Sequence, residues 1–322
     1  MRAITVTRPG GPEVLSLTDV DAPRPATGEL LVRVAAAGVN FRDIYVRSGV
    51  GVYAQPTPFV PGEEGAGTVL SIGPGVTDFA PGDNVAWSYA PGSYAEQVIV
   101  PAGRAVPVPH GIDLKVAAAV MVQGMTAHYL CHSTFPVAEG NICVVHAAAG
   151  GVGQQLTQQV KKLGGIVVAT ASTTAKAVLA QQAGADYVTA YDEFTEAVRR
   201  VSAERGADVV FDGVGKDTFD DSLASLRPRG MMVLYGGASG QVPPFDLQRL
   251  NTGGSLFITR PTLPAYVADR GELLWRAGDL FEWIAKGELD VRIGAEYPLD
   301  GAARAQEDLA ARRTTGKLVL IP

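Results

Sequence analysis

The segment from residue 141 to residue 163 constrains the fold of this chain more than any other part of the sequence. It reads NICVVHAAAGGVGQQLTQQVKKL, in which an apolar strand runs into a loop of small residues and then into a helix. The loop at 147–153 has the pattern Ala-x-x-Gly-x-x-Gly, a variant of the fingerprint Gly-x-Gly-x-x-Gly. Small residues let the backbone approach a pyrophosphate, and the helix start offers N–H groups and a positive dipole end. The alternative is a glycine-rich turn that binds no ligand.

The position of the glycines carries this interpretation, because their number does not. Glycine accounts for 38 of the 322 residues, more than the roughly 7% of an average chain. Most of these glycines lie in turns along the whole sequence. The residues expected to contact the pyrophosphate are those between the strand and the helix: Ala149, Gly150, Gly151, Val152 and Gly153.

Strands and helices alternate from about residue 116 onward, which predicts a parallel sheet with helices on both faces. The expected strands are 141–147, 166–170, 186–189, 207–211 and 231–234, and the expected helices are 115–134, 152–163, 174–184, 194–204, 217–226 and 273–286. The segment 303–322 closes the chain with a helix and a strand. We expect this last strand to return to the first domain.

Residues 1–118 are expected to be rich in β-structure. The segment 29–40 alternates and ends in a turn, and 65–76 and 93–103 are short apolar strands bounded by Gly and Pro. Pairs such as Pro61-Gly62 indicate many tight turns. This pattern is typical of a small barrel.

The end of the second expected strand indicates which dinucleotide binds. An NAD enzyme usually places Asp or Glu there to hold the ribose 2′-hydroxyl. This chain has no acid at that point and offers Ser172, Thr173, Thr174 and Lys176 instead. Hydroxyls and an ammonium suit a 2′-phosphate, because they donate hydrogen bonds and neutralise charge. The sequence therefore favours NADPH over NADH, although Lys176 alone could be a solvated helix residue.

Charge and cysteine content exclude several other classes of protein. The net charge is −6 and no long Lys/Arg run is present, which argues against nucleic acid as the main partner. No apolar run reaches the roughly 18–20 residues of a membrane span, and the first residues do not resemble a signal peptide. The two cysteines, Cys131 and Cys143, are too few for a structural zinc cluster. We expect a cytoplasmic protein.

One group of residues has the spacing of a metal site. His128, Cys131 and His132 fall at i, i+3 and i+4, so they share one face of a helix. No carboxylate lies nearby in the sequence to orient either histidine. A helix face packed against a neighbouring element is the favoured interpretation, and a metal site is the alternative.

Taken together, these motifs make the chain similar to the zinc-independent, zeta-crystallin-like quinone oxidoreductases of the medium-chain dehydrogenase/reductase superfamily. The motifs that carry the resemblance lie at 36–49, 61–69, 122–130, 146–154, 257–263 and 313–322. The resemblance implies an α/β fold in two domains. Residues 1–122 and 262–322 would form a GroES-like β-rich catalytic domain, and residues 123–261 a Rossmann domain with a doubly wound parallel sheet. It also implies homodimers through the Rossmann sheets, with 255–262 near the contact.

The zinc-dependent relatives of this family differ at two places. They have Gly-His-Glu where this chain has Gly62-Glu63-Glu64, and a Cys where it has Asn40 or its neighbours. The resemblance therefore implies that no metal is bound. Without a Lewis acid, the enzyme loses the usual means of polarising an alcohol or a carbonyl. This favours hydride transfer to an acceptor that is already electrophilic.

The resemblance also assigns site residues. Asn40, Asp43 and Tyr45 would line the nicotinamide and substrate side, with Tyr45 donating a proton or hydrogen bond to the acceptor. The alternatives from the residues themselves are a helix cap for Asn40, a first-turn acid for Asp43 and core packing for Tyr45. The other implied cofactor contacts are Thr126 near the nicotinamide or its phosphates, Ser172, Lys176 and Tyr191 at the 2′-phosphate, Tyr235, Gly236 and Ser239 after the fifth strand, and Arg312 and Lys317 near the C-terminus.

The hypothesis that follows is an NADPH-dependent quinone reductase that transfers a hydride, or single electrons, without zinc. The nearest alternative is reduction of the double bond of an enone, an alkenal or an enoyl thioester. A thioester of coenzyme A would need an anion-binding patch, for which Arg42, Arg47 and Arg260 are candidates. A third hypothesis, from another class, is a binding protein for AU-rich RNA, against which the net charge argues.

Overall fold

The computed structural model describes residues 1–322, and the chain divides into two compact units. The first unit comprises Met1–Val122 and Val267–Pro322, and the second comprises Gln123–Tyr266. Helix α2 (Leu114–Tyr129) contains the first point of division. The second point falls after Tyr266, where the sequence suggested residue 261, so the short helix α8 (Leu263–Tyr266) belongs to the second unit.

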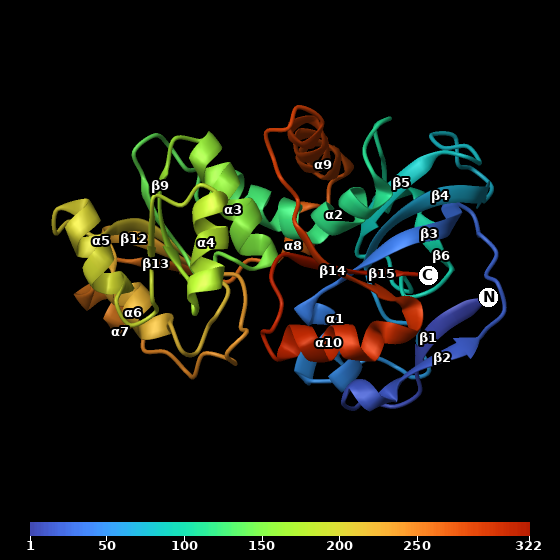
Figure 1. The fold of residues 1–322 in the computed structure, drawn as a ribbon, viewed down its shortest axis with the longest axis horizontal. Helices are drawn as coiled ribbons and strands as arrows, with labels where there is room; N and C mark the ends of the chain where they lie inside the picture. The colour runs from blue at the N-terminus through green and yellow to red at the C-terminus, as the bar shows by residue number, and fades with distance from the viewer. The chain divides into compact units, whose positions relative to one another are not determined.

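The first unit consists of a seven-stranded sheet, a two-stranded sheet and the helices beside them (Figure 1). Its strands are β1 (Arg2–Val6), β2 (Leu15–Asp19), β3 (Glu29–Val39), β4 (Glu64–Ile72), β5 (Asn84–Ser88), β6 (Gln97–Pro101), β7 (Ala105–Pro107), β14 (Ile293–Pro298) and β15 (Lys317–Ile321). Its helices are α1 (Phe41–Ser48), α9 (Arg270–Ala285) and α10 (Ala302–Ala310), with short 3-10 turns at Pro12–Val14, Gly51–Tyr53, Ala102–Arg104 and Leu299–Gly301.

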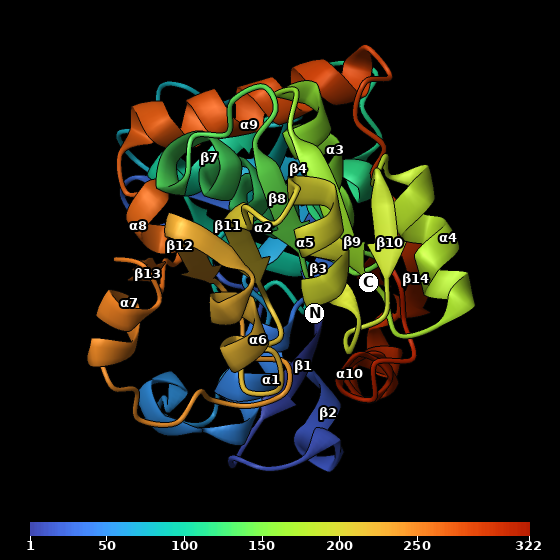
Figure 2. The same ribbon diagram turned by 90° about the vertical axis from the view of Figure 1, so that its left-hand side faces the viewer.

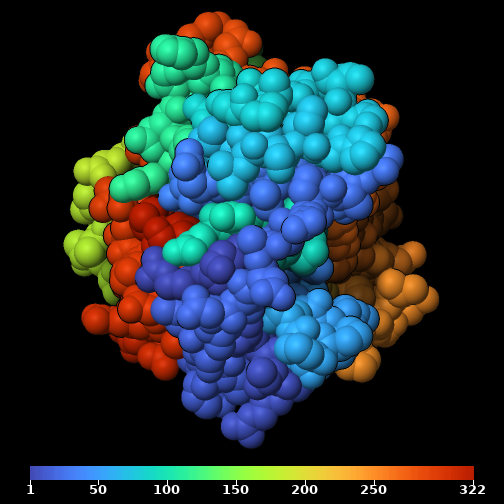
Figure 3. Space-filling model, turned by 90° about the vertical axis from the view of Figure 1, so that its right-hand side faces the viewer, coloured from blue at the N-terminus to red at the C-terminus, as the bar shows by residue number.

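The order of strands in the larger sheet brings the two ends of the chain together. The order is β14-β15-β3-β4-β5-β7, and β6 also pairs with β3. Strand β15 runs antiparallel to β3, with Leu318 opposite Val39 and Leu320 opposite Ala37. The expectation that the last strand returns to the first domain is therefore confirmed. Figure 3 shows the result at the surface, where residues from the end of the chain (red) lie against residues from its beginning (blue).

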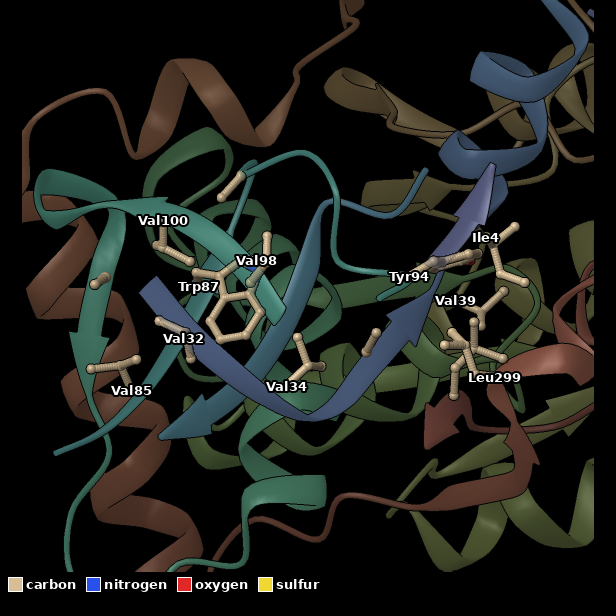
Figure 4. Close-up of a cluster of buried hydrophobic side chains, with 14 of the residues drawn as sticks. Ile4, Val32, Val34, Val39, Val85, Trp87, Tyr94, Val98, Val100 and Leu299 are labelled. Carbon is tan, nitrogen blue, oxygen red and sulfur yellow. The ribbon is translucent and has the colours of Figure 1, made fainter. Parts of the chain in front are cut away.

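A cluster of buried hydrophobic side chains forms the core of this unit. Trp87 is fully buried and lies among Val32, Val98 and Val100, as Figure 4 shows. Its indole N–H donates to the hydroxyl of Ser93 at 2.9 Å, so the one polar group of this side chain is paired. Each buried aliphatic side chain contributes about 1.5–3 kcal/mol. Tyr94 belongs to this core, packs against Gly62 and donates a hydrogen bond to Asp43 in α1.

The second unit is a six-stranded parallel sheet with the strand order β10-β9-β8-β11-β12-β13. Its strands are β8 (Ile142–Val145), β9 (Ile166–Thr170), β10 (Tyr187–Thr189), β11 (Ala207–Asp212), β12 (Leu226–Leu234) and β13 (Phe257–Thr259). Its helices, besides the end of α2 and α8, are a π-helical turn at Leu130–Thr134, α3 (Gly151–Lys162), α4 (Thr174–Gln182), α5 (Phe194–Ser202), α6 (Phe219–Ala224) and α7 (Gln248–Thr252).

Helices cover both faces of this parallel sheet. Helix α3 contacts α4, and α5 contacts α6, which groups them in two pairs. Because crossovers between parallel strands are right-handed, connections that run in opposite directions from β8 place these pairs on opposite faces. Figure 2 turns the unit toward the viewer, with β10 and β13 at the two edges. The sequence prediction of a doubly wound α/β fold is confirmed.

Several elements differ from the sequence prediction, and three of them are instructive. Where a turn was expected after residue 40, helix α1 begins at Phe41. Strand β12 begins at Leu226, whereas the expected strand began at 231. Strand β13 was not predicted, because a three-residue strand with an exposed Phe257 carries no periodicity of its own. None of the helices combines the length and the apolar content needed to cross a bilayer.

Candidate functional site

The glycine loop of the second unit joins β8 to α3. The helix begins at Gly151, and Gly150 is its N-cap with an extended backbone (φ −75°, ψ 171°). No side chain caps this end of the helix. The first N–H groups of a helix have no partner within it, so they are available to an anion together with the positive end of the helix dipole. This end of α3 fits the pyrophosphate of a dinucleotide.

Contacts within the protein explain two of the three glycines. A Cβ atom at Gly153 would lie 2.4 Å from the carbonyl oxygen of Ala147, so only glycine lets α3 approach the loop this closely. A Cβ atom at Gly151 would lie 1.8 Å from Oε1 of Gln123, so this glycine makes room for a side chain of α2. The third, Gly150, is less crowded, since a Cβ there would lie 3.1 Å from the same carbonyl oxygen.

Hydrogen bonds fix the first residue of the loop. Ala147 has a left-handed backbone (φ 50°), which is strained for a residue other than glycine. Its N–H donates to the hydroxyl of Tyr191 at 3.1 Å and to that of Thr170 at 3.3 Å. Tyr191, which was expected at the 2′-phosphate, is thus placed against the start of the glycine loop. The hydroxyl of Thr170 also lies 3.0 Å from Nδ1 of His146.

A buried polar cluster continues behind the loop. Nε2 of His146 lies 2.9 Å from the hydroxyl of Ser222, which donates to Asp212 at 3.1 Å. Asp212 also accepts the hydroxyl of Thr218 at 2.7 Å and the N–H of Val214 at 2.7 Å. Burial lowers the pKa of His146, so its imidazole is neutral at pH 7. His146 therefore links the strand before the glycine loop to Thr170 and Ser222.

The expected 2′-phosphate residues follow the ends of β9 and β10. The N–H of Ala171 donates to the carbonyl oxygen of Thr189 at 3.1 Å, which joins the two strand ends. Thr173 caps α4 by accepting the N–H of Lys176 at 3.3 Å. Ser172 is exposed and Lys176 is partly buried. An exposed hydroxyl and an ammonium at a helix N-terminus fit a phosphate.

The loop after β12 is held to the loop after β11. The N–H of Tyr235 donates to the carbonyl oxygen of Asp212 at 2.9 Å. A Cβ at Gly236 would lie 2.5 Å from the carbonyl oxygen of Gly213, which explains the glycine. The hydroxyl of Ser239 donates to the carbonyl oxygen of Val214 at 2.8 Å, so in the structure it fastens this loop. Burial raises the pKa of Tyr235 well above its usual range.

In the first unit, the start of α1 brings two of the expected catalytic residues together. The backbone N–H of Asn40 donates to Oδ2 of Asp43 at 2.8 Å, and the hydroxyl of Tyr94 donates to the same oxygen at 2.8 Å. Asp43 is 2% exposed. Burial raises the pKa of its carboxyl to about 7, against the effect of these two hydrogen bonds. Both structural alternatives, the helix cap and the first-turn acid, are therefore present.

The side chain of Asn40 is held on both sides by a buried ion pair. Its Nδ2 donates to Oε2 of Glu64 at 2.8 Å, and Nζ of Lys317 donates to its Oδ1 at 2.8 Å. Lys317 and Glu64 also form an ion pair with each other, at 1% and 0% side-chain exposure. The second oxygen of Glu64 accepts the N–H of Val122 at 2.5 Å. An anion on one side and a cation on the other fix which way the amide points.

This arrangement differs from the expectation for Lys317. The resemblance placed it among the cofactor contacts, whereas its ammonium is buried against Asn40 and Glu64. Glu64 was noticed in the sequence only as part of a departure from the zinc motif. The signal in the sequence was a glutamate at the start of an apolar segment, since a carboxylate that becomes buried there needs a cation.

Tyr45 lies one turn into α1, half-buried, with its ring centroid 5.3 Å from that of Tyr53. The guanidinium of Arg42 lies 5.2 Å from the ring centroid of Tyr53 and 5.3 Å from that of Tyr89. Arg42 also forms an ion pair with Glu63. The structure thus gathers aromatic rings and one arginine around the predicted proton donor.

Two further expected cofactor residues are Thr126 and Arg312. Thr126 is on α2 in the second unit and is 9% exposed. Arg312 follows α10 in the first unit, exposed and with a left-handed backbone (φ 56°).

The residues present do not fit a zinc ion. The rings of His128 and His132 stack at 4.0 Å with an interplanar angle of 7°, so they lie side by side. Sγ of Cys131 lies 3.2 Å from Nδ1 of His132, a hydrogen-bond contact. Glu63 and Glu64 are each engaged by a cation. No group of three or more His, Cys, Asp or Glu side chains in residues 1–322 is arranged to hold a metal.

Comparison with known proteins places both parts of the chain. Residues 26–110 match the alcohol dehydrogenase GroES-like domain, and residues 183–320 match the zinc-binding dehydrogenases. A quinone oxidoreductase of Pseudomonas aeruginosa is 42% identical over 97% of both chains. A 2-haloacrylate reductase of Burkholderia is 39% identical over 99% of this chain and 98% of its own. A mycobacterial protein solved in complex with NADPH is 46% identical over 100% of both chains, with a TM-score of 0.96.

Proposed function

The chain belongs to the quinone oxidoreductases of the medium-chain dehydrogenase/reductase superfamily, and on that premise we propose that it transfers a hydride from NADPH to a quinone without a metal. The observation that carries the proposal is the uncapped start of α3, with Gly150 as its N-cap and no acidic residue after β9. Similarity to a quinone oxidoreductase over nearly the whole chain supports the acceptor class.

Each unit has its own part in the proposed reaction. The second unit would bind the pyrophosphate at the start of α3 and the 2′-phosphate at Ser172, Lys176 and Tyr191. NADPH, when bound, supplies a hydride at its nicotinamide. The first unit would present the acceptor with Tyr45 and the side chain of Asn40. Holding the reactants at near-attack distance is the larger part of such catalysis.

The electron and proton balance defines what the side chains must do. A quinone that gains a hydride and one proton becomes a hydroquinone. The hydroxyl of Tyr45 is the proposed donor of that proton or of a hydrogen bond to the carbonyl oxygen. Hydrogen bonds to Glu64 and Lys317 fix the orientation of the Asn40 side-chain amide. A bound acceptor would therefore meet this amide in one orientation. Asp43 and Tyr94 fix the helix start that carries both residues.

The engagement of the candidate metal ligands supports the proposed independence from zinc. Arg42 and Lys317 already neutralise Glu63 and Glu64. A zinc ion would have to break two ion pairs, one of them fully buried, to use these oxygens. The experiment is dialysis against a chelator followed by elemental analysis. Retained activity with no bound zinc supports the proposal, and loss of activity that zinc restores would contradict it.

A second candidate function is supported by one relative. The 39% identical 2-haloacrylate reductase indicates that a related chain reduces an activated carbon–carbon double bond. Thioesters of coenzyme A are less compatible with the structure. Arg47 is 6% exposed and donates to Gln306 at 2.7 Å, and Arg42 is paired with Glu63, so two of three candidate arginines are engaged.

We also propose a homodimer, in a cytoplasmic setting. Strand β13 is the last strand of its sheet, and Phe257 on it is 55% exposed. A strand edge of this kind can pair with a second copy. Light scattering tests the dimer: Phe257→Asp should give a monomer where the unaltered chain gives a dimer.

The proposed cytoplasmic setting rests on the cysteines. Both are buried and free, which fits a reducing compartment.

The experiment that tests the function is steady-state NADPH oxidation with 1,4-benzoquinone, 9,10-phenanthrenequinone, an alkenal and crotonyl-CoA. We expect kcat/KM to be highest with a quinone. A rate with crotonyl-CoA or the alkenal far above every quinone would overturn the proposal in favour of double-bond reduction.

A further inference from the structure

An ion pair lies beside the proposed acceptor side of α1. Nε of Arg42 donates to Oε2 of Glu63 at 2.5 Å, and Nη2 donates to Oε1 at 3.3 Å. This two-point contact places the guanidinium and the carboxylate edge to edge. The Arg42 side chain is 40% exposed and that of Glu63 is 21% exposed. The pair can therefore be reached by a small molecule.

The pair is connected to Tyr45 through aromatic rings. Arg42 and Tyr45 are three residues apart on α1, so they lie on neighbouring positions of one helix face. The ring of Tyr53 lies near both, 5.3 Å from the ring of Tyr45 and 5.2 Å from the guanidinium. Tyr89 stands within 5.3 Å of the guanidinium as well. A molecule that contacts the hydroxyl of Tyr45 would thus meet Arg42 one helical turn away.

The contribution of the Arg42–Glu63 ion pair to the stability of the fold is too small to explain this arrangement of side chains. A half-exposed ion pair contributes at most about 1 kcal/mol. Tyr89 has a left-handed backbone (φ 58°), a conformation that is costly for a bulky residue. The segment before Glu63 turns at Gly62 (φ 87°), where a Cβ would lie 2.2 Å from the ring of Tyr94. The strained backbone of Tyr89, beside a weak ion pair, points to a functional constraint.

We propose that Arg42 and Glu63 together determine the charge of the acceptor that the enzyme accepts. Nη1 of Arg42 is not used by Glu63 and can donate to a neutral carbonyl oxygen. Glu63 cancels the positive charge that would otherwise attract an anionic substituent. The pair therefore favours neutral quinones and disfavours acceptors that carry a carboxylate or a sulfonate. This inference rests on the proposed function and names its substrate class.

The test compares two acceptors that differ by one charged group, 1,4-naphthoquinone and 1,4-naphthoquinone-2-sulfonate. The measured quantity is the ratio of kcat/KM for the sulfonate to kcat/KM for the neutral quinone. Reporting each variant relative to the unaltered enzyme removes the difference in reactivity between the two quinones. Glu63→Gln should raise the ratio about tenfold, because it leaves Arg42 with an uncompensated charge near the acceptor.

The chain offers a matched control in the same unit. Glu96 pairs with Arg2 at 2.8 Å on the surface, so Glu96→Gln makes the same change in net charge away from Tyr45. We expect Glu96→Gln to leave the ratio within about twofold of the unaltered enzyme. Equal shifts in Glu63→Gln and Glu96→Gln would overturn the inference, because overall charge would then explain them.

A second variant should change the ratio of kcat/KM values in the opposite direction. Arg42→Gln leaves the carboxylate of Glu63 uncompensated, so it should lower the ratio and also lower kcat/KM for the neutral quinone. Arg2→Gln is its control. A ratio that rises or stays constant in Arg42→Gln would contradict the inference even if Glu63→Gln failed to fold. If the unaltered enzyme reduced neither quinone, the proposed function itself would fail, which separates the two conclusions.

Discussion

The two units treat their polar groups in opposite ways. In the first unit, Asn40, Glu64 and Lys317 satisfy one another in a buried cluster, so their geometry is fixed before any ligand arrives. In the second unit, the N-terminus of α3 has no side-chain cap, and glycines keep it open. A region that satisfies itself can orient a reactant, while a region that leaves N–H groups without a side-chain partner needs an anion to complete it. This difference supports the proposed division of labour, with the cofactor bound by the second unit and the acceptor by the first.

The largest expected effect comes from breaking the buried cluster. Lys317→Met would leave the carboxylate of Glu64 buried without its cation, at 0% side-chain exposure. Removing one partner of a buried ion pair costs about 3–5 kcal/mol. Urea denaturation measures this loss of unfolding free energy. Lys286→Met is the control, because Lys286 pairs with Glu282 on the surface. Similar small losses in both variants would show that the cluster is not the rigid element of the first unit.

The next effect is expected at the open end of α3. Gly153→Ala places a Cβ 2.4 Å from the carbonyl oxygen of Ala147, so the helix must move away from the loop. Overpacking of this kind costs about 1–3 kcal/mol. We expect Kd for NADPH to rise more than tenfold, measured by fluorescence titration. At Gly103 a Cβ meets nothing within 4 Å, so Gly103→Ala should leave Kd unchanged. An unchanged Kd in Gly153→Ala would remove the glycine loop from the cofactor site.

A pH dependence of stability is expected from Asp43. Its pKa is raised to about 7 in the folded protein by burial, whereas an unfolded carboxyl titrates near 3.9. The folded state therefore binds a proton that the unfolded state has lost, and its stability falls as pH rises from about 4 to about 7. Asp43→Asn keeps an acceptor oxygen for Asn40 and Tyr94 but cannot ionise. The difference in urea midpoint between the variant and the unaltered chain should thus grow in favour of Asn from pH 5 to pH 8. A constant difference would contradict the raised pKa.

A smaller effect distinguishes the two dinucleotides. Lys176→Ala removes the ammonium proposed to contact the 2′-phosphate, so it should weaken NADPH about tenfold and leave NADH nearly unchanged. The control is Lys162→Ala, which should leave both Kd values unchanged. Lys162 lies in the last turn of α3, at the end of the helix away from the glycine loop. The ratio of the two Kd values is the measurement. An equal ratio in Lys176→Ala and the unaltered chain would assign the 2′-phosphate to other residues.

The second unit was more predictable from sequence than the first. The strand, glycine loop and helix around residue 150 are continuous in the chain, and alternation of short patterns predicted the parallel sheet. The cluster in the first unit joins residues far apart: Asn40 and Glu64 are 24 positions apart, and Glu64 and Lys317 are 253 apart. No local pattern encodes such a contact. The capping pair of Asn40 and Asp43 was visible in the sequence, yet α1 was expected to be a turn because its eight residues give little periodicity.

A structure of the enzyme with NADPH tests the central claim most directly. We expect the pyrophosphate oxygens within about 3 Å of the N–H groups at the start of α3. The 2′-phosphate should contact Ser172 or Lys176. A pyrophosphate bound away from Gly150–Gly153, or a 2′-phosphate that points into solvent, would contradict the account of the cofactor site.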